Sequence, residues 1–128
     1  MVVGKPDEIG PDTVVHRVGG GNLANLRLSP LDRQQIPVGI SALLGGRPEE
    51  AAAQMRSAFP NSRKWRTTSQ TVGSTTVAAI RRAGFEVVPD ATSRFPNHAR
   101  LIHPQGEVGF EDANLELLAQ TFQDTTGC

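Results

Sequence analysis

The apolar residues of this chain occur in short stretches, and this distribution most constrains how the chain can fold. The longest stretches, such as Val38–Leu44, fall far short of the ~20 residues that a membrane-spanning helix requires. The N-terminus also lacks the apolar region of a secretory signal peptide. We therefore expect no membrane contact and no signal peptide in this chain. At 128 residues, its short strands and helices should share one core.

Turn-forming residues mark where the domain begins. Gly4, Pro6, Gly10 and Pro11 stand among charged residues with no apolar period, which is typical of a linker. We therefore expect a leader over residues 1–12 and a single globular domain over residues 13–128.

Hydrophobic periodicity predicts the elements of that domain. Period-two alternation of β-branched and apolar residues favours strands, whereas a stripe every three to four residues favours helices. Ser74 is the expected N-cap of the second helix, and Gly84 is its expected left-handed C-terminal residue. Strands are predicted over 13–18, 38–44, 85–89 and 99–103, the last two pairing antiparallel, and helices over 48–59, 75–83 and 111–122. The order predicts an α+β fold, with a small mixed or antiparallel β-sheet packed against two or three helices.

The charge balance limits the partners of the chain. Thirteen Lys and Arg residues oppose thirteen Asp and Glu residues, so the formal net charge is zero. Because phosphate neutralisation supplies much of the affinity for nucleic acids, binding RNA would require a locally basic surface. The single cysteine, Cys128, excludes an internal disulfide and a cysteine-based zinc site.

One basic cluster could supply such a surface. Arg63, Lys64 and Arg66 surround Trp65, the only tryptophan. A cationic strip with one aromatic ring can hold phosphates and stack a base. The alternative interpretation is a solvated run of charges beside one core aromatic residue.

Three histidines are the candidates for proton transfer near neutral pH: His16, His98 and His103. Two imidazoles across one pocket can act as base and acid in the cleavage of an RNA phosphodiester. Arg17 or Arg100 could then stabilise the charge of the phosphorane. This chemistry would need no metal. The alternative for each histidine is a structural hydrogen-bonding role at the end of a strand.

A run of hydroxyl residues precedes the second predicted helix. Ser74, Thr75 and Thr76 would lie at its N-terminus, where backbone N–H groups favour an anion such as a phosphate. Helix capping alone explains the same residues.

Several segments together resemble the variable C-terminal toxin domains of bacterial polymorphic toxins, including the Rhs type. The segments are Thr13–Gly21, Gly39–Ser41, Gly84–Asp90, Phe95–Pro104 and Gly109–Leu115, and the resemblance covers residues 13–128. It implies a small effector enzyme that is secreted, acts in the cytoplasm of a target cell and is neutralised at home by a cognate immunity protein. No residue roles are carried over from the resemblance.

Within this class two chemistries compete, and a non-catalytic module is a further alternative. The favoured hypothesis is a metal-independent ribonuclease that needs no cofactor and takes RNA as substrate. His103 and His16 are its predicted acid/base pair, with phosphate contacts from His98, Arg17 and Arg100 and RNA contacts from Lys64 and Trp65. The first alternative is ADP-ribosyl transfer from NAD, with Arg17, the hydroxyls at 74–76 and Glu107 or Glu111 in sequence order. The second alternative is a non-catalytic binding or immunity-type module.

Overall fold

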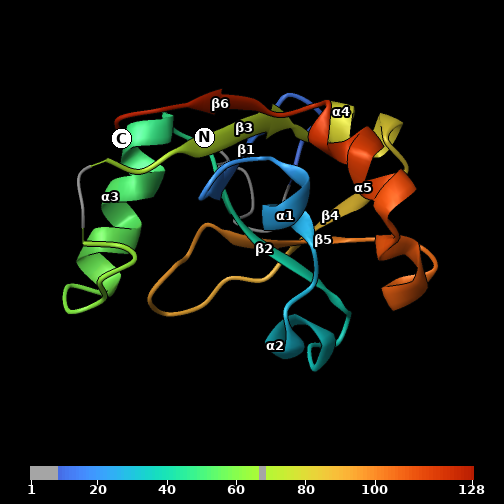
Figure 1. Ribbon diagram of the computed structural model, residues 1–128, viewed down its shortest axis with the longest axis horizontal. Helices are drawn as coiled ribbons and strands as arrows, with labels where there is room; N and C mark the ends of the chain where they lie inside the picture. Colours follow the sequence, from blue (N-terminus) through green and yellow to red (C-terminus); the bar gives the residue numbers. More distant parts are fainter. Residues whose placement is uncertain (1–8, 67–68) are drawn as a thin grey trace, which may run out of the picture.

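Six antiparallel strands form a single sheet, and helices pack against it, in a computed structural model that describes residues 9–66 and 69–128 (Figure 1). The predicted α+β class is confirmed. The strand order across the sheet is β4-β5-β2-β1-β3-β6, so the first strand of the chain lies inside the sheet. The strands are β1 (Val14–Val18), β2 (Gly39–Leu44), β3 (Val72–Thr76), β4 (Glu86–Pro89), β5 (His98–Ile102) and β6 (Gln123–Thr125).

The helices differ greatly in length. They are α1 (Leu23–Leu26), α2 (Pro30–Arg33), α3 (Pro48–Ala58), α4 (Val77–Arg82) and α5 (Asp112–Ala119), with a 3-10 helix over Gly106–Phe110. Pro48 begins α3 at its first turn, where a missing N–H costs nothing. In the described residues no helix has both the length and the apolar character needed to cross a membrane.

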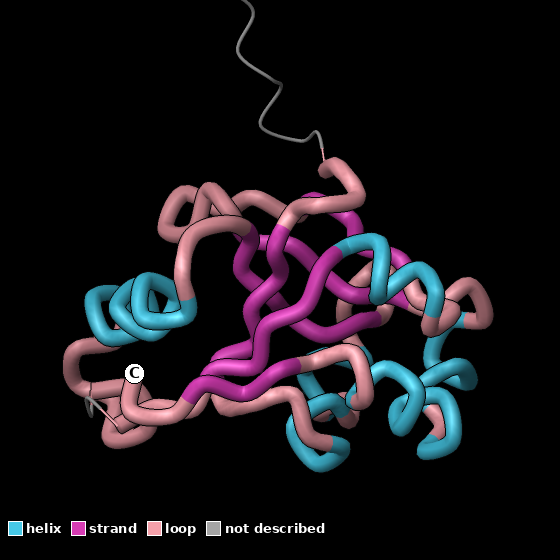
Figure 2. The backbone as a smooth tube through the Cα atoms, turned by 90° about the horizontal axis from the view of Figure 1, so that it is seen from above, coloured by secondary structure: helices cyan, strands magenta, loops and turns pink. Residues whose placement is uncertain are grey.

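Two hydrophobic clusters lie on opposite faces of the sheet, because successive side chains of a strand point to opposite sides. Val15 and Ile40 belong to the larger cluster, which includes buried residues of α1, α4 and α5. Val18 and Leu43 belong to the smaller cluster, which α3 covers through Ala51 and Ala52. Figure 2 shows the helices gathered at the two ends of the sheet. His98 lies on the face under α3, opposite Leu43, whereas Arg17 alternates with His16 and Val18 and starts from the face of Val15.

The segment around residue 74 differs from its prediction. Residues 72–76 form β3, and the helix begins only at Val77, capped by Thr76, whose Oγ1 accepts the Ala79 N–H at 3.2 Å. Ser74 is therefore not the N-cap. The local reason is that β-branched Val72, Thr75 and Thr76 pair along the free edge of β1. The C-terminal prediction is confirmed, since Gly84 has a φ of +92°.

Other boundaries also shift. The predicted antiparallel pairing of the third and fourth strands is confirmed as β4 with β5. Strand β6, which pairs antiparallel with β3, was not predicted because Gln123–Thr125 has no apolar alternation. Residues 1–8 of the predicted leader lie outside the described residues. Residues 9–12 contact the folded domain, since Ile9 packs against the larger cluster and the Ala78 N–H donates to Pro11 O at 2.9 Å.

Candidate functional site

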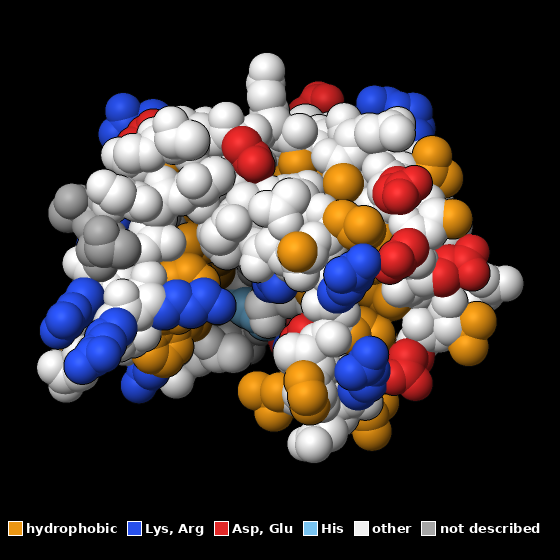
Figure 3. Space-filling model, viewed as in Figure 1, with side chains coloured by type: hydrophobic (Ala, Val, Ile, Leu, Met, Phe, Trp, Pro, Cys, Tyr) orange, Lys and Arg blue, Asp and Glu red, His pale blue; other side chains and the backbone are white. Residues whose placement is uncertain are grey.

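A groove of about 590 Å³ opens on the α3 side of the molecule, a volume ordinary for a small-molecule site. One wall comes from the α1–α2 segment, and the other comes from the end of α3 and the loop after it. Residues of β1 and β2 form the floor, and His98 lies at the start of β5. Figure 3 shows the hollow, with a histidine side chain at its bottom and Lys or Arg side chains along one wall.

Arg17 reaches the groove from β1. Its Nε and Nη2 donate to Asn25 O at 3.1 and 2.8 Å, and its Nη1 donates to Ser41 O at 2.8 Å. Within residues 9–66 and 69–128, Arg17 forms no ion pair. Burial lowers the pKa of Arg17, and the charge of Asp32 opposes this shift. A cation held by carbonyls alone is a preorganised site for an anion.

His98 lines the groove, and only one of its ring nitrogens has a hydrogen-bond partner among the described residues. Its Nδ1 lies 2.8 Å from Asp90 O and 3.3 Å from Asp90 Oδ2. Because a carbonyl oxygen only accepts, Nδ1 carries the hydrogen and Nε2 keeps its lone pair. No described residue hydrogen-bonds that Nε2. The hydrogen bond to Asp90 therefore orients the ring and leaves Nε2 available to accept a proton.

Arg100 does not line the groove. It is 8% exposed, and its Nη1 donates to Gly39 O at 2.9 Å. Its Nη2 lies 3.3 Å from Asp90 Oδ2. Arg100 therefore holds the carboxylate of Asp90 in place, and contacts His98 only through that residue.

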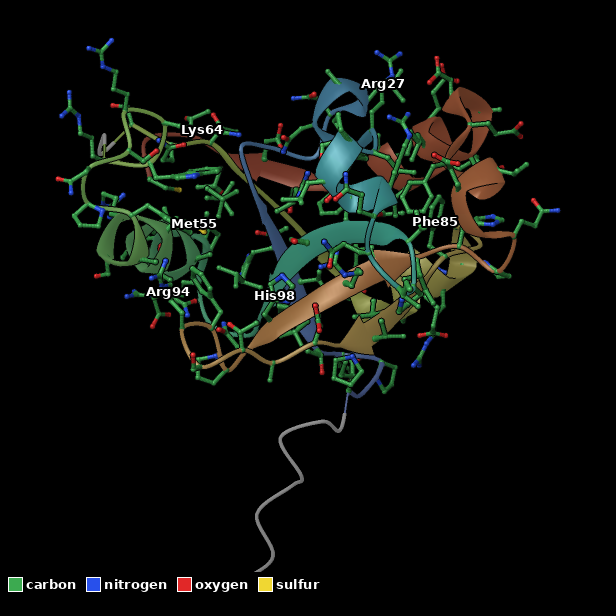
Figure 4. The ribbon with its side chains drawn as sticks, turned by 90° about the horizontal axis from the view of Figure 1, so that it is seen from below. Arg27, Met55, Lys64, Phe85, Arg94 and His98 are labelled. Atoms are coloured by element: carbon green, nitrogen blue, oxygen red, sulfur yellow. The ribbon has the colours of Figure 1, made fainter. Side chains whose placement is uncertain are left out.

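Lys64 and Trp65 lie on the wall that follows α3. The Lys64 Nζ lies 4.5 Å from the centre of the Trp65 ring, within the range of a cation–π contact. Beside them, the rings of Phe59 and Phe95 are 6.1 Å apart, and Arg94 lies 5.3 Å from the Phe59 ring. Figure 4 shows Lys64, Met55 and Arg94 on this side and His98 next to it. The wall is thus aromatic with cations at its surface.

His16 reaches the groove only marginally. It is 1% exposed, and both ring nitrogens are engaged, Nδ1 with Ser74 Oγ at 2.7 Å and Nε2 with Gly46 O at 2.9 Å. His16 pairs with Leu43, which pairs with His98, so these histidines are two strands apart, about 10 Å. His16 acts as a structural link between β1, β3 and the turn after β2.

His103 lies elsewhere. It follows the end of β5, accepts the Gln105 N–H at 3.1 Å and meets Phe85 edge-on at 4.9 Å. It does not line the groove, and Gly109 packs against its ring. The structure therefore does not bring His103 and His16 together as the predicted acid/base pair. Instead it gathers Arg17, His98, Lys64 and Trp65.

The hydroxyl run Ser74–Thr76 lies on β3, outside this groove. Thr75 Oγ1 is buried with no hydrogen-bond partner in the described part of the chain. These residues line a separate depression beside the end of α5. Of the three hydroxyl residues predicted at the helix N-terminus, Thr76 does lie there as the N-cap of α4, whereas Ser74 and Thr75 lie within β3.

The residues considered for NAD chemistry are dispersed. Glu107 pairs with Arg33 at 2.7 Å, and Glu111 precedes α5 in an exposed position. Neither lines the groove with Arg17. Across the described residues, no group of three or more His, Cys, Asp or Glu side chains is placed to hold a metal ion.

Sequence reasoning missed Asp90 and Asp32, and only Asp90 had a usable signal. Since β4 and β5 were expected to pair antiparallel, continuing the register from Pro89 and Ala99 places Asp90 opposite His98. The Asp90 N–H does donate to His98 O at 2.9 Å. Asp32 had no such signal, because its place in the groove depends on the path of the loop between β1 and β2.

Comparisons with protein-family models, with curated proteins and with solved structures found no match for this chain. The resemblance to polymorphic toxin domains stays a prediction.

Proposed function

We propose that this chain is a toxin-like ribonuclease that cleaves RNA without a metal, with its reactive centre in the groove. The observation that supports it is that His98 and Arg17 line the same hollow. Among the described residues, Nε2 of His98 has no hydrogen-bond partner and the guanidinium of Arg17 forms no ion pair. One supplies proton transfer, and the other supplies a fixed positive charge for a phosphate.

The reaction would be an internal transesterification. His98 Nε2 takes the proton of the ribose 2′-OH, and the 2′ oxygen forms a bond to phosphorus. The bond from phosphorus to the 5′ oxygen breaks, and that oxygen takes a proton from solvent. The products are a 2′,3′-cyclic phosphate and a 5′-hydroxyl end. Arg17 and Lys64 stabilise the charge on the phosphorane oxygens.

The distribution of charge supports an RNA partner. Arg63, Lys64 and Arg66 lie in the loop after α3, and Arg94 lies over Phe59 at the same end. The acidic residues Glu107, Glu111, Asp112 and Glu116 lie in or beside the 3-10 helix and α5, where Glu107 pairs with Arg33 and Asp112 pairs with Arg27. Figure 3 shows blue side chains beside the hollow and red ones at the far side. A chain of zero net charge thus presents a basic surface at its groove.

The cellular setting follows from the resemblance alone. We propose a secreted effector that acts in the cytoplasm of a target cell and is bound by an immunity protein in the producing cell. An immunity protein with acidic side chains that covers the groove would block both Arg17 and His98.

The test is cleavage of a labelled RNA by the purified chain in excess chelator. We expect wild-type cleavage with cyclic phosphate ends, and a fall of about 10²-fold or more for His98→Ala. His103→Ala is the matched control, because it removes an imidazole outside the groove, and it should keep most of the activity.

Intact RNA after incubation with the wild-type chain would contradict the proposal. Transfer of label from NAD to a protein substrate would then favour the transferase. Equal losses in His98→Ala and His103→Ala would also contradict the role of the groove.

A further inference from the structure

The two walls of the groove differ in chemistry in a way that the cleavage mechanism does not use. One wall presents the aromatic rings of Phe59, Trp65 and Phe95. The other wall carries a carboxylate, that of Asp32 in α2. Stacking supplies affinity for any base, whereas a polar group at a fixed place distinguishes one base from another.

The aromatic wall is built to hold a planar group. Met55, Trp65 and Phe95 pack against the smaller hydrophobic cluster, which anchors the rings from behind. All three remain only partly buried, so part of each side chain stays accessible from the groove. Base stacking on such rings contributes substantial affinity in RNA-binding proteins and does not depend on which base it is.

Asp32 lies in α2, on the wall that faces the aromatic rings, and hydrogen bonds to Ser29 fix its side chain. Its Oδ2 accepts the Ser29 N–H at 2.9 Å, while the Asp32 N–H donates to Ser29 Oγ at 3.1 Å. This reciprocal pair locks the side chain of Asp32. The second carboxylate oxygen, Oδ1, has no hydrogen-bond partner among the described residues. Asp32 thus presents a rigid acceptor at the groove.

The four RNA bases meet a carboxylate differently. Guanine carries two adjacent donors, N1–H and the N2 amino group, which match the two oxygens of a carboxylate. Cytosine and adenine each place a ring-nitrogen acceptor next to their amino donor, and uracil flanks its single N–H with two carbonyls. An acceptor-only group therefore favours guanine and is repelled by part of each other base.

We propose that the groove is a guanine-selective subsite, in which the base stacks on the wall of Phe59, Trp65 and Phe95 and donates to Asp32. This inference rests on the proposed ribonuclease function and deepens it. The base held there would be the one whose ribose presents its 2′-OH to His98. Cleavage would then fall on the 3′ side of guanosine.

Binding of 3′-mononucleotides tests the subsite apart from catalysis. Because Trp65 is the only tryptophan, its fluorescence reports stacking at this wall. We expect 3′-GMP to quench Trp65 at concentrations about tenfold lower than 3′-AMP, 3′-CMP or 3′-UMP. In Asp32→Asn, which replaces an acceptor oxygen by an NH₂ donor, the preference for 3′-GMP should disappear.

A further variant separates recognition of guanine from a general change of charge. Asp12→Asn, a carboxylate in a turn outside the groove, should bind as the wild type does. Equal quenching by all four nucleotides, no quenching by any, or a guanine preference that survives in Asp32→Asn would overturn the inference.

The outcomes distinguish this inference from the function on which it rests. RNA cleavage with no base preference overturns the guanine subsite and leaves the ribonuclease. Selective quenching by 3′-GMP without any RNA cleavage supports the subsite and overturns the ribonuclease.

Discussion

Arg17 forms no ion pair with any carboxylate of the described residues, unlike Arg27, Arg33 and Arg81. Arg27, Arg33 and Arg81 form ion pairs with Asp112, Glu107 and Glu86 at 3.1, 2.7 and 2.9 Å. These pairs are about half exposed and contribute little to stability. Arg17 instead holds its guanidinium against Asn25 O and Ser41 O. Its charge is thus available to a ligand that enters the groove.

His16 is a buried histidine whose hydrogen bonds give it a structural role. Since Gly46 O only accepts, Nε2 carries the hydrogen and Nδ1 accepts the hydroxyl of Ser74. We predict that Ser74→Ala lowers the free energy of unfolding by about 1–2 kcal/mol, because it leaves a buried ring nitrogen unpaired. The measurement is urea denaturation, with Ser57→Ala, an exposed serine of α3, as the control. An unchanged midpoint for Ser74→Ala would refute this structural link.

At the residue scale, the sequence identifies which residues could take part in catalysis or binding, but not which residues surround them in the fold. Arg17, His98, Lys64 and Trp65 are singled out by type alone and share the groove. The environments of His16 and His103 depend on Gly46 and Phe85, which lie far from them along the chain. Such non-local contacts have no signature in the spacing of three histidines.

At the scale of elements, the contact between β2 and β5 sets the position of His98. Gly39 opens β2, and a Cβ at this position would meet the backbone oxygen of Leu101. Backbone cannot move aside as a flexible side chain does, so the paired strand would have to shift.

We therefore predict that Gly39→Ala destabilises the fold by about 3 kcal/mol or more. Gly10→Ala is the matched control, because a Cβ there meets only Thr13 Oγ1 at 3.8 Å. Thermal unfolding of both variants measures the difference. Equal melting temperatures would show that the β2–β5 pairing is looser than described.

Strand β3 shows where periodicity gives the wrong element. Val77 and Ile80 are buried, as the helical prediction required. The helix was predicted to begin two residues too early, at residue 75. The residues before Val77 are strand instead, because Val72–Thr76 pairs with β1 along its whole length. Pairing with a distant strand overrides local propensity. The helices at 48–59 and 111–122 were predicted within a few residues, because their apolar stripes contact the core directly.

At the scale of the whole molecule, the separation of charge is invisible in the net charge of zero. The fold places the basic loop after α3 along one wall of the groove, whereas Asp112 of α5 pairs with Arg27 of the other wall at 3.1 Å. The folded arrangement creates a basic surface for RNA that composition alone does not reveal.

This arrangement predicts a salt-dependent affinity for single-stranded RNA. Removing Lys64 should lower the slope of log affinity against log salt by about 0.7, the value for one phosphate contact on a single strand. Arg82→Ala removes a cation on α4, outside the groove, and should leave the slope unchanged. Filter binding of an RNA with a 2′-deoxy linkage, which resists cleavage, measures both. Identical slopes for Lys64→Ala and Arg82→Ala would place the RNA elsewhere.

The central claim is that His98 moves a proton while Arg17 supplies charge, and chemical rescue tests it most directly. The measurement is the rate of RNA cleavage by His98→Ala in chelator, with and without added imidazole. We predict that imidazole raises this rate in proportion to its concentration, and that it has no such effect on Arg17→Ala, which keeps its own base. A His98→Ala variant that cleaves as fast as the wild type, or that imidazole affects no more than it affects Arg17→Ala, would contradict the account.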